Sequence, residues 1–197
     1  MLLLGGCGHP VKAQEPLREA PAEVNTAGLL ASNGDPLKSY RACFLATCID
    51  EVGTVEATGK NDGERVEQYL RSVNLGPGYP WCAALPHWAA RQCGRTFEPA
   101  REFAMAARWH VASARIWQRK GWSPDTAEWS PVSAPGDHLA IYYKSLGRIG
   151  HTAVIIEETE DYFLTVEGNT NAEGSREGNG VFIRKRLKAS TYCVSRW

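Results

Sequence analysis

Hydrophobic residues in the first half of the body recur at helical spacing. From Pro36 onward, apolar side chains return every three or four positions, which predicts a helix that ends near Gly53. The pattern resumes after the polar loop at 58–63 and predicts a second helix with Asp62 as its cap. The apolar stripe expected for the first helix consists of Leu37, Tyr40, Phe44, Cys48 and Val52, with Leu45 and Ile49 beside it. The inward face expected for the second helix consists of Val66, Tyr69, Leu70 and Val73.

Two more helical segments are expected before the pattern changes. Residues 74–80 hold two glycines and two prolines, so this stretch is expected to be irregular. A third helix is predicted over 81–93, closed by Gly94. The Ala-rich stretch at 102–117 predicts a shorter helical piece.

The period changes from helical to extended after the turn Pro135-Gly136-Asp137. Five segments beyond it are rich in β-branched and aromatic residues and are separated by turn residues, which predicts strands. They are 138–143, 151–156, 162–167, 181–186 and 192–196. Helices followed by strands predict an α+β fold, with N-terminal helices packed on a largely antiparallel sheet of about five strands.

Composition limits the classes to which the chain can belong. Of its 197 residues, 43% are hydrophobic and 22% are charged, which is typical of a globular domain. Lys and Arg together number 22, as do Asp and Glu, so the net charge is zero and general binding to nucleic acid is disfavoured. No stretch holds the roughly 20 apolar residues of a membrane-spanning helix. Residues 1–36 are rich in Pro and polar residues and are predicted to be a flexible tether, with the folded domain at 37–197.

The chain has six cysteines, and none belongs to a C-x-x-C pair, so a structural zinc site has no support. Two of them, Cys7 and Cys82, are treated separately below. The other four, Cys43, Cys48, Cys93 and Cys193, are compatible with three disulfide pairings or with buried free thiols.

Cys82 has the local setting of a reactive thiol. A Gly/Pro-rich loop precedes it, and Pro86 requires the following helix to begin close to Cys82 because proline is tolerated in the first turn. A thiol at a helix N-terminus faces unpaired N–H groups and the positive end of the helix dipole. Both favour the thiolate, which is the nucleophilic form.

A proton-transfer partner for this thiol is expected among the strands. His151 directly follows Gly150 and opens an apolar segment, so its ring is expected to point off the end of a strand into a groove. Glu167 and Asn169 lie two positions apart at the end of the next strand and therefore share a face. If these two strands pair antiparallel, Glu167 or Asn169 can reach His151 and orient its ring.

Four segments in this order resemble the CHAP family of cysteine, histidine-dependent amidohydrolases and peptidases. They are PWCAA, a PGD turn into a strand, GHTAVI and VEGNT; TGKNDGERVEQYL upstream is also similar to members from bacterial envelopes. The resemblance covers roughly residues 40–186 and implies a papain-like fold. It also implies that Cys82 is the nucleophile, His151 the general base and acid, and Glu167 the orienting group, with Asn169 assisting.

The resemblance implies a peptidoglycan hydrolase that needs no metal or organic cofactor. Such an enzyme cleaves an amide bond either within the stem peptide or where that peptide joins the sugar. Tyr79 and Trp81 flank Cys82 and are expected to line the substrate groove. Leu4-Gly5-Gly6-Cys7 resembles the lipobox of bacterial lipoproteins, which implies a lipid anchor on Cys7 and a place on the periplasmic side of the bacterial envelope. The anchor would be the chain's one contact with a membrane.

Several residues also have simpler interpretations. His138 is a competing base, whereas His87 is expected to be structural or on the surface, and His9 and His110 have no partner in the sequence. Asn61-Asp62-Gly63 fits a turn better than a calcium loop. The basic run 184–188 is expected on a solvated strand edge. Two functions remain as alternatives, namely a non-catalytic wall-binding lipoprotein and an amidase of the same fold that acts on another amide.

Overall fold

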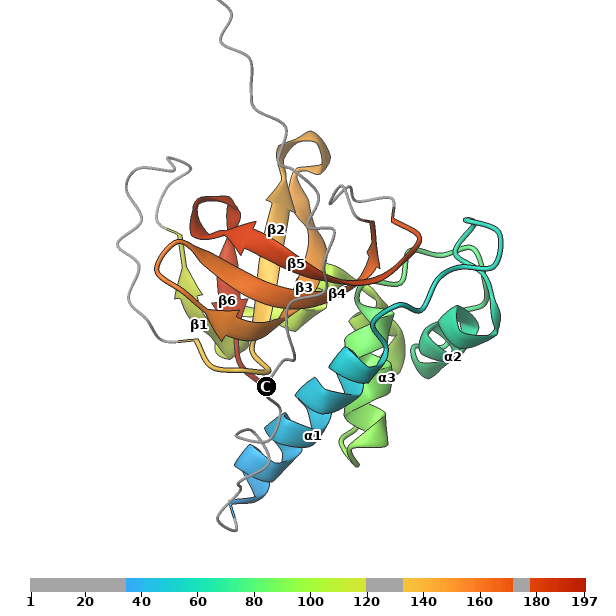
Figure 1. Ribbon diagram of the computed structural model, residues 1–197, viewed down its shortest axis with the longest axis horizontal. Coiled ribbons are helices and arrows are strands. Elements are labelled where there is room, and N and C mark those ends of the chain that lie inside the picture. Colours follow the sequence, from blue (N-terminus) through green and yellow to red (C-terminus); the bar gives the residue numbers. More distant parts are fainter. Residues whose placement is uncertain (1–34, 120–132, 172–177) are drawn as a thin grey trace, which may run out of the picture.

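The computed structural model describes residues 35–119, 133–171 and 178–197. Three helices lie on one side of a six-stranded sheet, as Figure 1 shows. The helices are α1 (Pro36–Asp50), α2 (Glu64–Ser72) and α3 (Ala84–Gln92). The strands are β1 (Arg115–Gln118), β2 (His138–Tyr143), β3 (Arg148–Glu158), β4 (Tyr162–Thr170), β5 (Gly180–Leu187) and β6 (Cys193–Ser195). The α+β fold class is thereby confirmed.

Helix α1 begins where the sequence predicts it. The side chain of Asp35 accepts hydrogen bonds from the backbone N–H groups of the first turn, and Pro36 occupies a position where proline is favourable. The buried face holds Ala42, Phe44, Leu45 and Cys48. The expected stripe is wrong at both ends: Leu37 is 50% exposed, and Val52 is 39% exposed because the helix has already ended at Asp50.

The four residues predicted for the inward face of the second helix are all fully buried; three lie in α2, and Val73 is its C-cap. The predicted cap at the start of this helix is wrong, because the N-cap is Gly63, with a φ of 110°. The Asp62 carboxylate instead accepts hydrogen bonds from the backbone N–H of Thr58 at 2.9 Å and from its hydroxyl at 2.6 Å. Asp62 therefore closes the loop before the helix rather than capping the helix itself.

The sheet has the strand order β1-β6-β2-β3-β4-β5, and every neighbouring pair is antiparallel. The five predicted strands correspond to β2 through β6. Strand β1 (Arg115–Gln118) was not expected, because its first three residues fall in the stretch predicted to be helical. That stretch instead forms 3-10 turns at Ala100–Ala104, Ala106–His110 and Ala112–Ala114. Met105 and Val111 have extended backbone between these turns, which prevents a continuous helix.

The two faces of the sheet bury different sets of residues, in keeping with the alternation along each strand. Ala140, Val154 and Ile156 face the helices and join the main core. Leu139, Ala153, Ile155, Phe163 and Val194 form a smaller cluster on the other face. In the main core, the rings of Phe97, Phe103, Trp109 and Trp197 meet at centroid distances of 5.0 to 6.1 Å.

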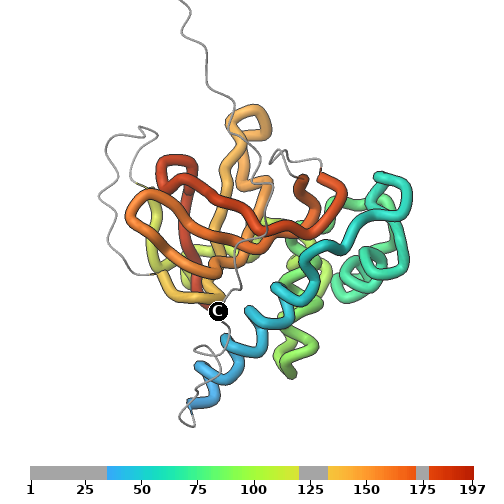
Figure 2. Tube along the Cα trace, in the orientation of Figure 1, coloured from blue at the N-terminus to red at the C-terminus, as the bar shows by residue number. Residues whose placement is uncertain are grey.

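A disulfide links two of the helices, and backbone hydrogen bonds link the segment after α1 to the sheet. A disulfide joins Cys43 in α1 to Cys93 just after α3, whereas Cys48 and Cys193 are free and buried. The segment after α1 returns to the sheet and runs beside the start of β5 (Figure 2). There the backbone N–H of Glu56 donates to the carbonyl of Asn179 at 2.8 Å. Glu56 is thereby brought next to the sheet.

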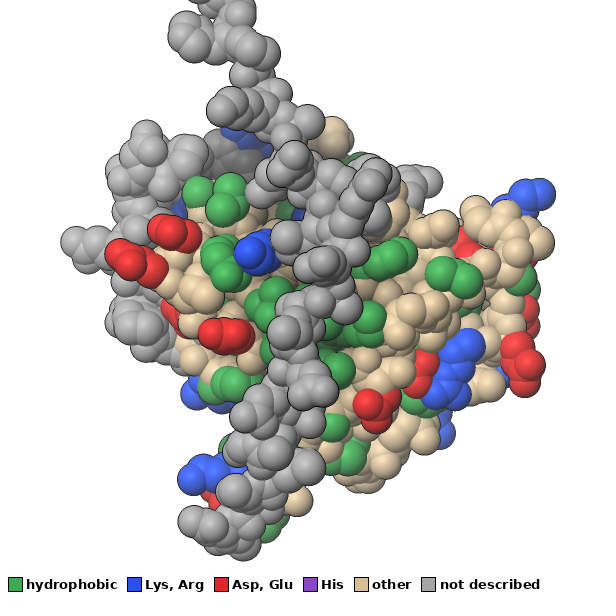
Figure 3. Space-filling model, viewed as in Figure 1, with side chains coloured by type: hydrophobic (Ala, Val, Ile, Leu, Met, Phe, Trp, Pro, Cys, Tyr) green, Lys and Arg blue, Asp and Glu red, His purple; other side chains and the backbone are tan. Residues whose placement is uncertain are grey.

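The surface carries charges of both signs. Figure 3 shows acidic and basic side chains interspersed on the face it draws, without a large patch of one sign. Among the described residues, no helix combines the length and the apolar character needed to cross a membrane. The predicted tether, except for Asp35 and Pro36, lies outside the described residues, as do Cys7 and His9.

Candidate active site

Cys82 lies in the turn that leads into α3, two residues before the helix begins, and is 8% exposed. The carbonyl of Trp81 accepts hydrogen bonds from the backbone N–H groups of Ala84 at 3.0 Å and Leu85 at 3.2 Å. Pro86 is the third residue of the helix, where its missing N–H costs nothing. The start predicted from Pro86 is confirmed, although the helix begins three residues after Trp81.

Trp81 holds the Cys82 turn in place. Its backbone N–H donates to Asn169 Oδ1 at 3.2 Å, and its indole N–H donates to Glu56 Oε1 at 2.9 Å. The ring is fully buried and lies so close to Gly168 that a Cβ there would be 2.6 Å from it. The expectation that Trp81 lines the substrate groove is therefore wrong. Tyr79 is 50% exposed and does line a groove beside Cys82.

His151 approaches Cys82 from the sheet. It is the fourth residue of β3 and not the first, so the expected position at the strand end is wrong. Its Nε2 lies 2.7 Å from Glu167 Oε2, and the ring also forms a hydrogen bond with the Cys82 thiol. Antiparallel pairing of β3 with β4 brings Glu167 to His151, as expected.

The electrostatics of this pair favour charge separation. Burial alone raises the pKa of the Cys82 thiol, but the hydrogen bond and charge of His151, together with the backbone N–H of Thr152, lower it below its ordinary value. Burial alone lowers the pKa of His151, but the bonds with Cys82 and Glu167 outweigh it and raise the pKa to about 9. A thiolate beside an imidazolium is the protonation state that these two shifts favour.

The other two free cysteines that the structure describes behave in the opposite way. Burial raises the pKa of the Cys193 thiol to about 12 and also raises that of Cys48. Neither thiol therefore has the character of a nucleophile at neutral pH. Cys82 differs from them through its contact with His151 rather than through exposure, since all three are buried.

Glu167 is held in one orientation by three donors. Arg186 donates through Nε to Oε1 at 2.7 Å and through Nη2 to Oε2 at 2.5 Å, and the hydroxyl of Thr165 donates to Oε1 at 2.7 Å. Burial raises the pKa of Glu167, but the charge of Arg186 and the bonds with Arg186 and His151 hold it well below its usual range. Glu167 therefore stays ionised beside His151.

Arg186 was not recognised from the sequence, which placed it on a solvated edge. Its side chain is only 15% exposed. The alternation of the strands gives only a partial signal: Thr165 pairs with Arg184 across β4 and β5, so Glu167 and Arg186 lie on that same face. The direct partner of Glu167 is Phe182, however, so Arg186 lies four positions out of register and reaches the carboxylate only through its long side chain.

Asn169 has a different place from the one expected. Among the described residues it forms no hydrogen bond with His151. Its amide N–H₂ donates to Asn61 Oδ1 and to the carbonyl of Gly178, both at 2.9 Å, and its Oδ1 accepts the backbone N–H of Trp81. A positive φ of 52° turns the chain here and aims the side chain at the Cys82 turn instead of at His151. Asn169 thus contacts the turn that carries Cys82.

The remaining described histidines are structural. His87 is buried, with Nδ1 3.0 Å from the Ser72 hydroxyl and Nε2 3.1 Å from the carbonyl of Phe97. His110 lies between the hydroxyls of Ser195 and Thr152. His138, the competing base, stacks on Trp109 at a centroid distance of 4.4 Å, and burial lowers its pKa to about 3.

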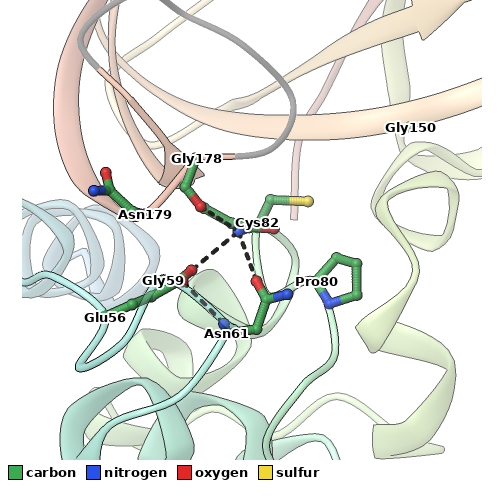
Figure 4. A pocket seen from close by; sticks show the side chains of 9 residues that line it. Glu56, Gly59, Asn61, Pro80, Cys82, Gly150, Gly178 and Asn179 are labelled. Carbon is green, nitrogen blue, oxygen red and sulfur yellow. Dashed lines mark hydrogen bonds between the residues drawn. The ribbon is translucent and has the colours of Figure 1, made fainter.

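Two hollows of different character meet at Cys82. The first, here called the Glu56 pocket, has a volume of about 120 Å³ and is lined by Glu56, Asn61 and Asn169 together with Gly59, Gly178 and Asn179. The second, here called the Tyr79 groove, has a volume of about 370 Å³ and is lined by Tyr79, Met105, Arg101 and Arg148 among others. Pro80, Cys82 and Gly150 line both. Figure 4 shows the Glu56 pocket, with the sulfur of Cys82 beside it and the hydrogen bonds that join its polar side chains.

No metal-binding group is present among the described residues, since no three of their His, Cys, Asp or Glu side chains cluster in a way that could hold an ion. Asn61-Asp62-Gly63 forms a turn, with a positive φ of 57° at Asn61. The turn interpretation of this segment agrees with the hydrogen bonds between Asp62 and Thr58.

Residues 74–169 match the family model for the CHAP domain. The matched range includes Cys82, His151, Glu167 and Asn169. CHAP domains have a papain-like fold and belong to hydrolases of the peptidoglycan amidase and peptidase type. Comparison with curated proteins gave no match, and comparison with solved structures gave none either.

Proposed function

We propose that this chain, which contains a CHAP domain, is a cysteine hydrolase that cleaves an amide bond of peptidoglycan. The observation that carries the proposal is the interaction of Cys82 with His151, whose Nε2 lies 2.7 Å from Glu167 Oε2. A nucleophile, a base and a group that orients the base are the parts required for covalent acyl transfer. The lowered pKa of Cys82 and the raised pKa of His151 suit these roles.

The reaction proceeds through a thioester. The Cys82 thiolate attacks the carbonyl carbon of the amide, and His151 gives its proton to the leaving amine as the C–N bond breaks. Neutral His151 then takes a proton from water, which attacks the thioester and releases the carboxylate and the thiol. Glu167 keeps the ring in one tautomer and stabilises the imidazolium.

The start of α3 suits the charge that forms during this reaction. The tetrahedral intermediate carries a negative oxygen close to Cys82. Backbone N–H groups at a helix N-terminus stabilise such an oxygen, and the N–H of Cys82 is our proposed donor. The rigid hold on the neighbouring Trp81 keeps this donor in place during the reaction.

Purified protein acting on isolated sacculi provides the test. We expect soluble fragments whose masses show new amino and carboxyl ends, and no such fragments from Cys82→Ala. Cys193→Ala is the matched control, because it removes a free thiol with a raised pKa outside the site. Equal product from the wild type and from Cys82→Ala would reject the proposal.

The same products identify the bond. A stem-peptide endopeptidase releases peptides with a new internal N-terminus, whereas an N-acetylmuramoyl-L-alanine amidase releases whole stem peptides from the sugar. A non-catalytic wall-binding protein releases neither. It would also show no preferential labelling of Cys82 by a thiol-directed electrophile at neutral pH, which runs against the lowered pKa of this thiol.

We place the enzyme at the bacterial envelope, on the periplasmic side, with Cys7 as its lipid anchor. The support is the sequence Leu4-Gly5-Gly6-Cys7, together with the disulfide between Cys43 and Cys93, since disulfides are typical of oxidising compartments. Feeding cells a labelled fatty acid tests this placement. Label on the wild type and not on Cys7→Ala is expected, and a soluble, unlabelled wild type would contradict it.

A further inference from the structure

We propose that the Glu56 pocket binds an ammonium group of the substrate, close to the amide that is cleaved. The inference rests on the proposed function because it assigns a subsite beside Cys82. Pocket and nucleophile are contiguous: Cys82, Pro80 and Gly150 line the pocket together with Glu56. A substrate group held there lies within a few bonds of the carbonyl that the thiolate attacks.

Glu56 differs from the other buried carboxylates in lacking a cationic partner. Glu51 pairs with Arg65, Glu167 pairs with Arg186, and Asp137 pairs with two arginines, Arg41 and Arg196. Glu56 is 9% exposed, and no Lys, Arg or His among the described residues forms an ion pair with it. A buried carboxylate without a counter-charge is costly unless another group supplies one.

The donors that do reach Glu56 are neutral. Oε1 accepts the indole N–H of Trp81 at 2.9 Å and lies 3.5 Å from the amide nitrogen of Asn169. Oε2 accepts the backbone N–H of Asn61 at 2.9 Å. These bonds fix the orientation of the carboxylate without cancelling its charge. Each oxygen retains capacity to accept a further bond from a ligand.

The rest of the pocket adds acceptors. Asn61 Oδ1 and the carbonyl of Gly178 both take a bond from Asn169 Nδ2, so oxygens face one another around that amide. Glu56 is the one carboxylate among the described residues of the lining, and the other anionic group there is the Cys82 thiolate itself. A primary ammonium has several N–H donors for these acceptor oxygens and a positive charge that complements Glu56.

The hollow on the other side of Cys82 has the opposite character. Arg101 and Arg148 line the Tyr79 groove, and Glu102, the one acidic residue in the described part of its lining, is 3.1 Å from Arg108. Tyr79 and Met105 add exposed apolar surface there. An ammonium group is repelled from two arginines and attracted to Glu56. The two hollows therefore set the direction in which a charged peptide lies across Cys82.

Peptidoglycan peptides offer such a group in two places, on the side chain of a diamino acid and at a peptide N-terminus. The shared chemistry is a primary ammonium near an amide bond. A diamino-acid side chain and an N-terminus differ in their distance from the cleaved bond, so acetylating each separately shows which of them occupies the pocket.

The experiment measures binding to the full chain carrying Cys82→Ala, so that no probe is consumed. The probes are a synthetic stem peptide with one lysine, the same peptide acetylated on the lysine, acetylated on the N-terminus, and acetylated on both. We expect one acetylation to raise the dissociation constant at least about tenfold, which is the range for a charge-assisted hydrogen bond in a partly buried site. The acetylation that raises it identifies the amine.

Glu56→Gln, added to Cys82→Ala, then removes the charge and keeps the shape. We expect the ratio between the free and the acetylated peptide to fall to about one, while affinity for the doubly acetylated peptide changes little. Glu56→Asp is expected to retain part of the ratio. A purely structural role of Glu56 would weaken all four peptides equally and leave the ratio intact. Glu157→Gln, which removes an exposed carboxylate of β3, controls for net charge.

The inference is overturned by equal dissociation constants for free and acetylated peptides, by an unchanged ratio in Glu56→Gln, or by no binding of any probe at millimolar concentration. These outcomes are separate from failure of the proposed function. A wild type that binds the free amine selectively but leaves sacculi intact would reject the hydrolase and keep the ammonium site.

Discussion

The two layers that meet at the site are held together by different forces. On the sheet, His151, Glu167 and Arg186 form a chain of charged and charge-assisted hydrogen bonds. On the helical side, no cationic side chain among the described residues takes part: the backbone N–H of Trp81 donates to the Asn169 amide oxygen and its indole N–H donates to the Glu56 carboxylate, which fixes the turn of Cys82. The base is thus positioned by electrostatics, and the nucleophile by packing and hydrogen bonds.

The two layers therefore control different properties of the site: the sheet controls the pKa values, and the helical side controls the position of the sulfur. Charges on the sheet set the pKa values of the reacting groups, since Glu167 raises the pKa of His151 and His151 lowers that of Cys82. Contacts on the helical side set where the sulfur lies and leave its charge state to His151. Substitutions in the sheet should therefore change pH dependence, and substitutions around Trp81 should change rates at every pH.

The largest effect is expected for His151→Ala. Loss of the base should lower kcat/KM by a factor of about 10³ or more. It should also raise the pKa of Cys82, because burial then acts without the compensating imidazolium. The measurement is the rate of alkylation of Cys82 by iodoacetamide from pH 5 to 10. Wild-type alkylation rates at neutral pH in this variant would show that His151 does not activate the thiol.

Glu167→Gln should have the next largest effect, roughly 10² to 10⁴ in kcat/KM. Against the lowering effect of burial, the bonds with Cys82 and Glu167 together raise the pKa of His151 to about 9, so removal of the carboxylate lowers that pKa. The imidazolium that protonates the leaving amine is then lost at a lower pH. We expect the alkaline limb of the pH profile to lie near 9 in the wild type and to move down in the variant. An unmoved alkaline limb would contradict the assignment.

In the sheet, the sequence predicted the pair of His151 and Glu167 but not the arginine, Arg186, that holds Glu167. Antiparallel pairing of two apolar strands was enough to bring Glu167 to His151, because register follows from alternation and from the turn between the strands. The same reasoning missed Arg186, since a basic run looks alike whether it faces solvent or a buried carboxylate. Burial of one face of β5 depends on tertiary packing, which the run itself does not encode.

The helical layer was predicted less completely. Pro86 correctly indicated that α3 begins near Cys82. Trp81 was expected in the groove, but its ring is buried because Gly168 leaves room for it against β4. Asn169 was expected at His151, but its positive φ turns the side chain toward Trp81. Both errors concern contacts between residues far apart in the sequence, where local patterns carry no distance information.

Trp81→Phe tests the helical layer with a smaller expected effect. The substitution keeps a ring against Gly168 and removes the indole N–H that Glu56 Oε1 accepts. We expect unfolding free energy to fall by about 1–3 kcal/mol and kcat/KM by about tenfold, with the pH limbs unmoved. Trp109→Phe is the matched control, since it removes a comparable indole bond, 3.1 Å to the carbonyl of Phe103, away from Cys82. A shifted pH profile in Trp81→Phe would contradict the separation of the two layers.

The smallest effect on catalysis is expected when Cys43 and Cys93 are both replaced by Ser. Their disulfide joins α1 to the end of α3, a sequence separation of 50 residues, and neither sulfur lines the hollows at Cys82. A loop of this length predicts a loss of about 2–4 kcal/mol in unfolding free energy. Because Trp81 fixes the start of α3 independently, kcat/KM per folded molecule should stay within about twofold. Denaturant unfolding and active-site titration measure the two quantities. A large fall in kcat/KM without unfolding would mean that the far end of α3 also positions the nucleophile.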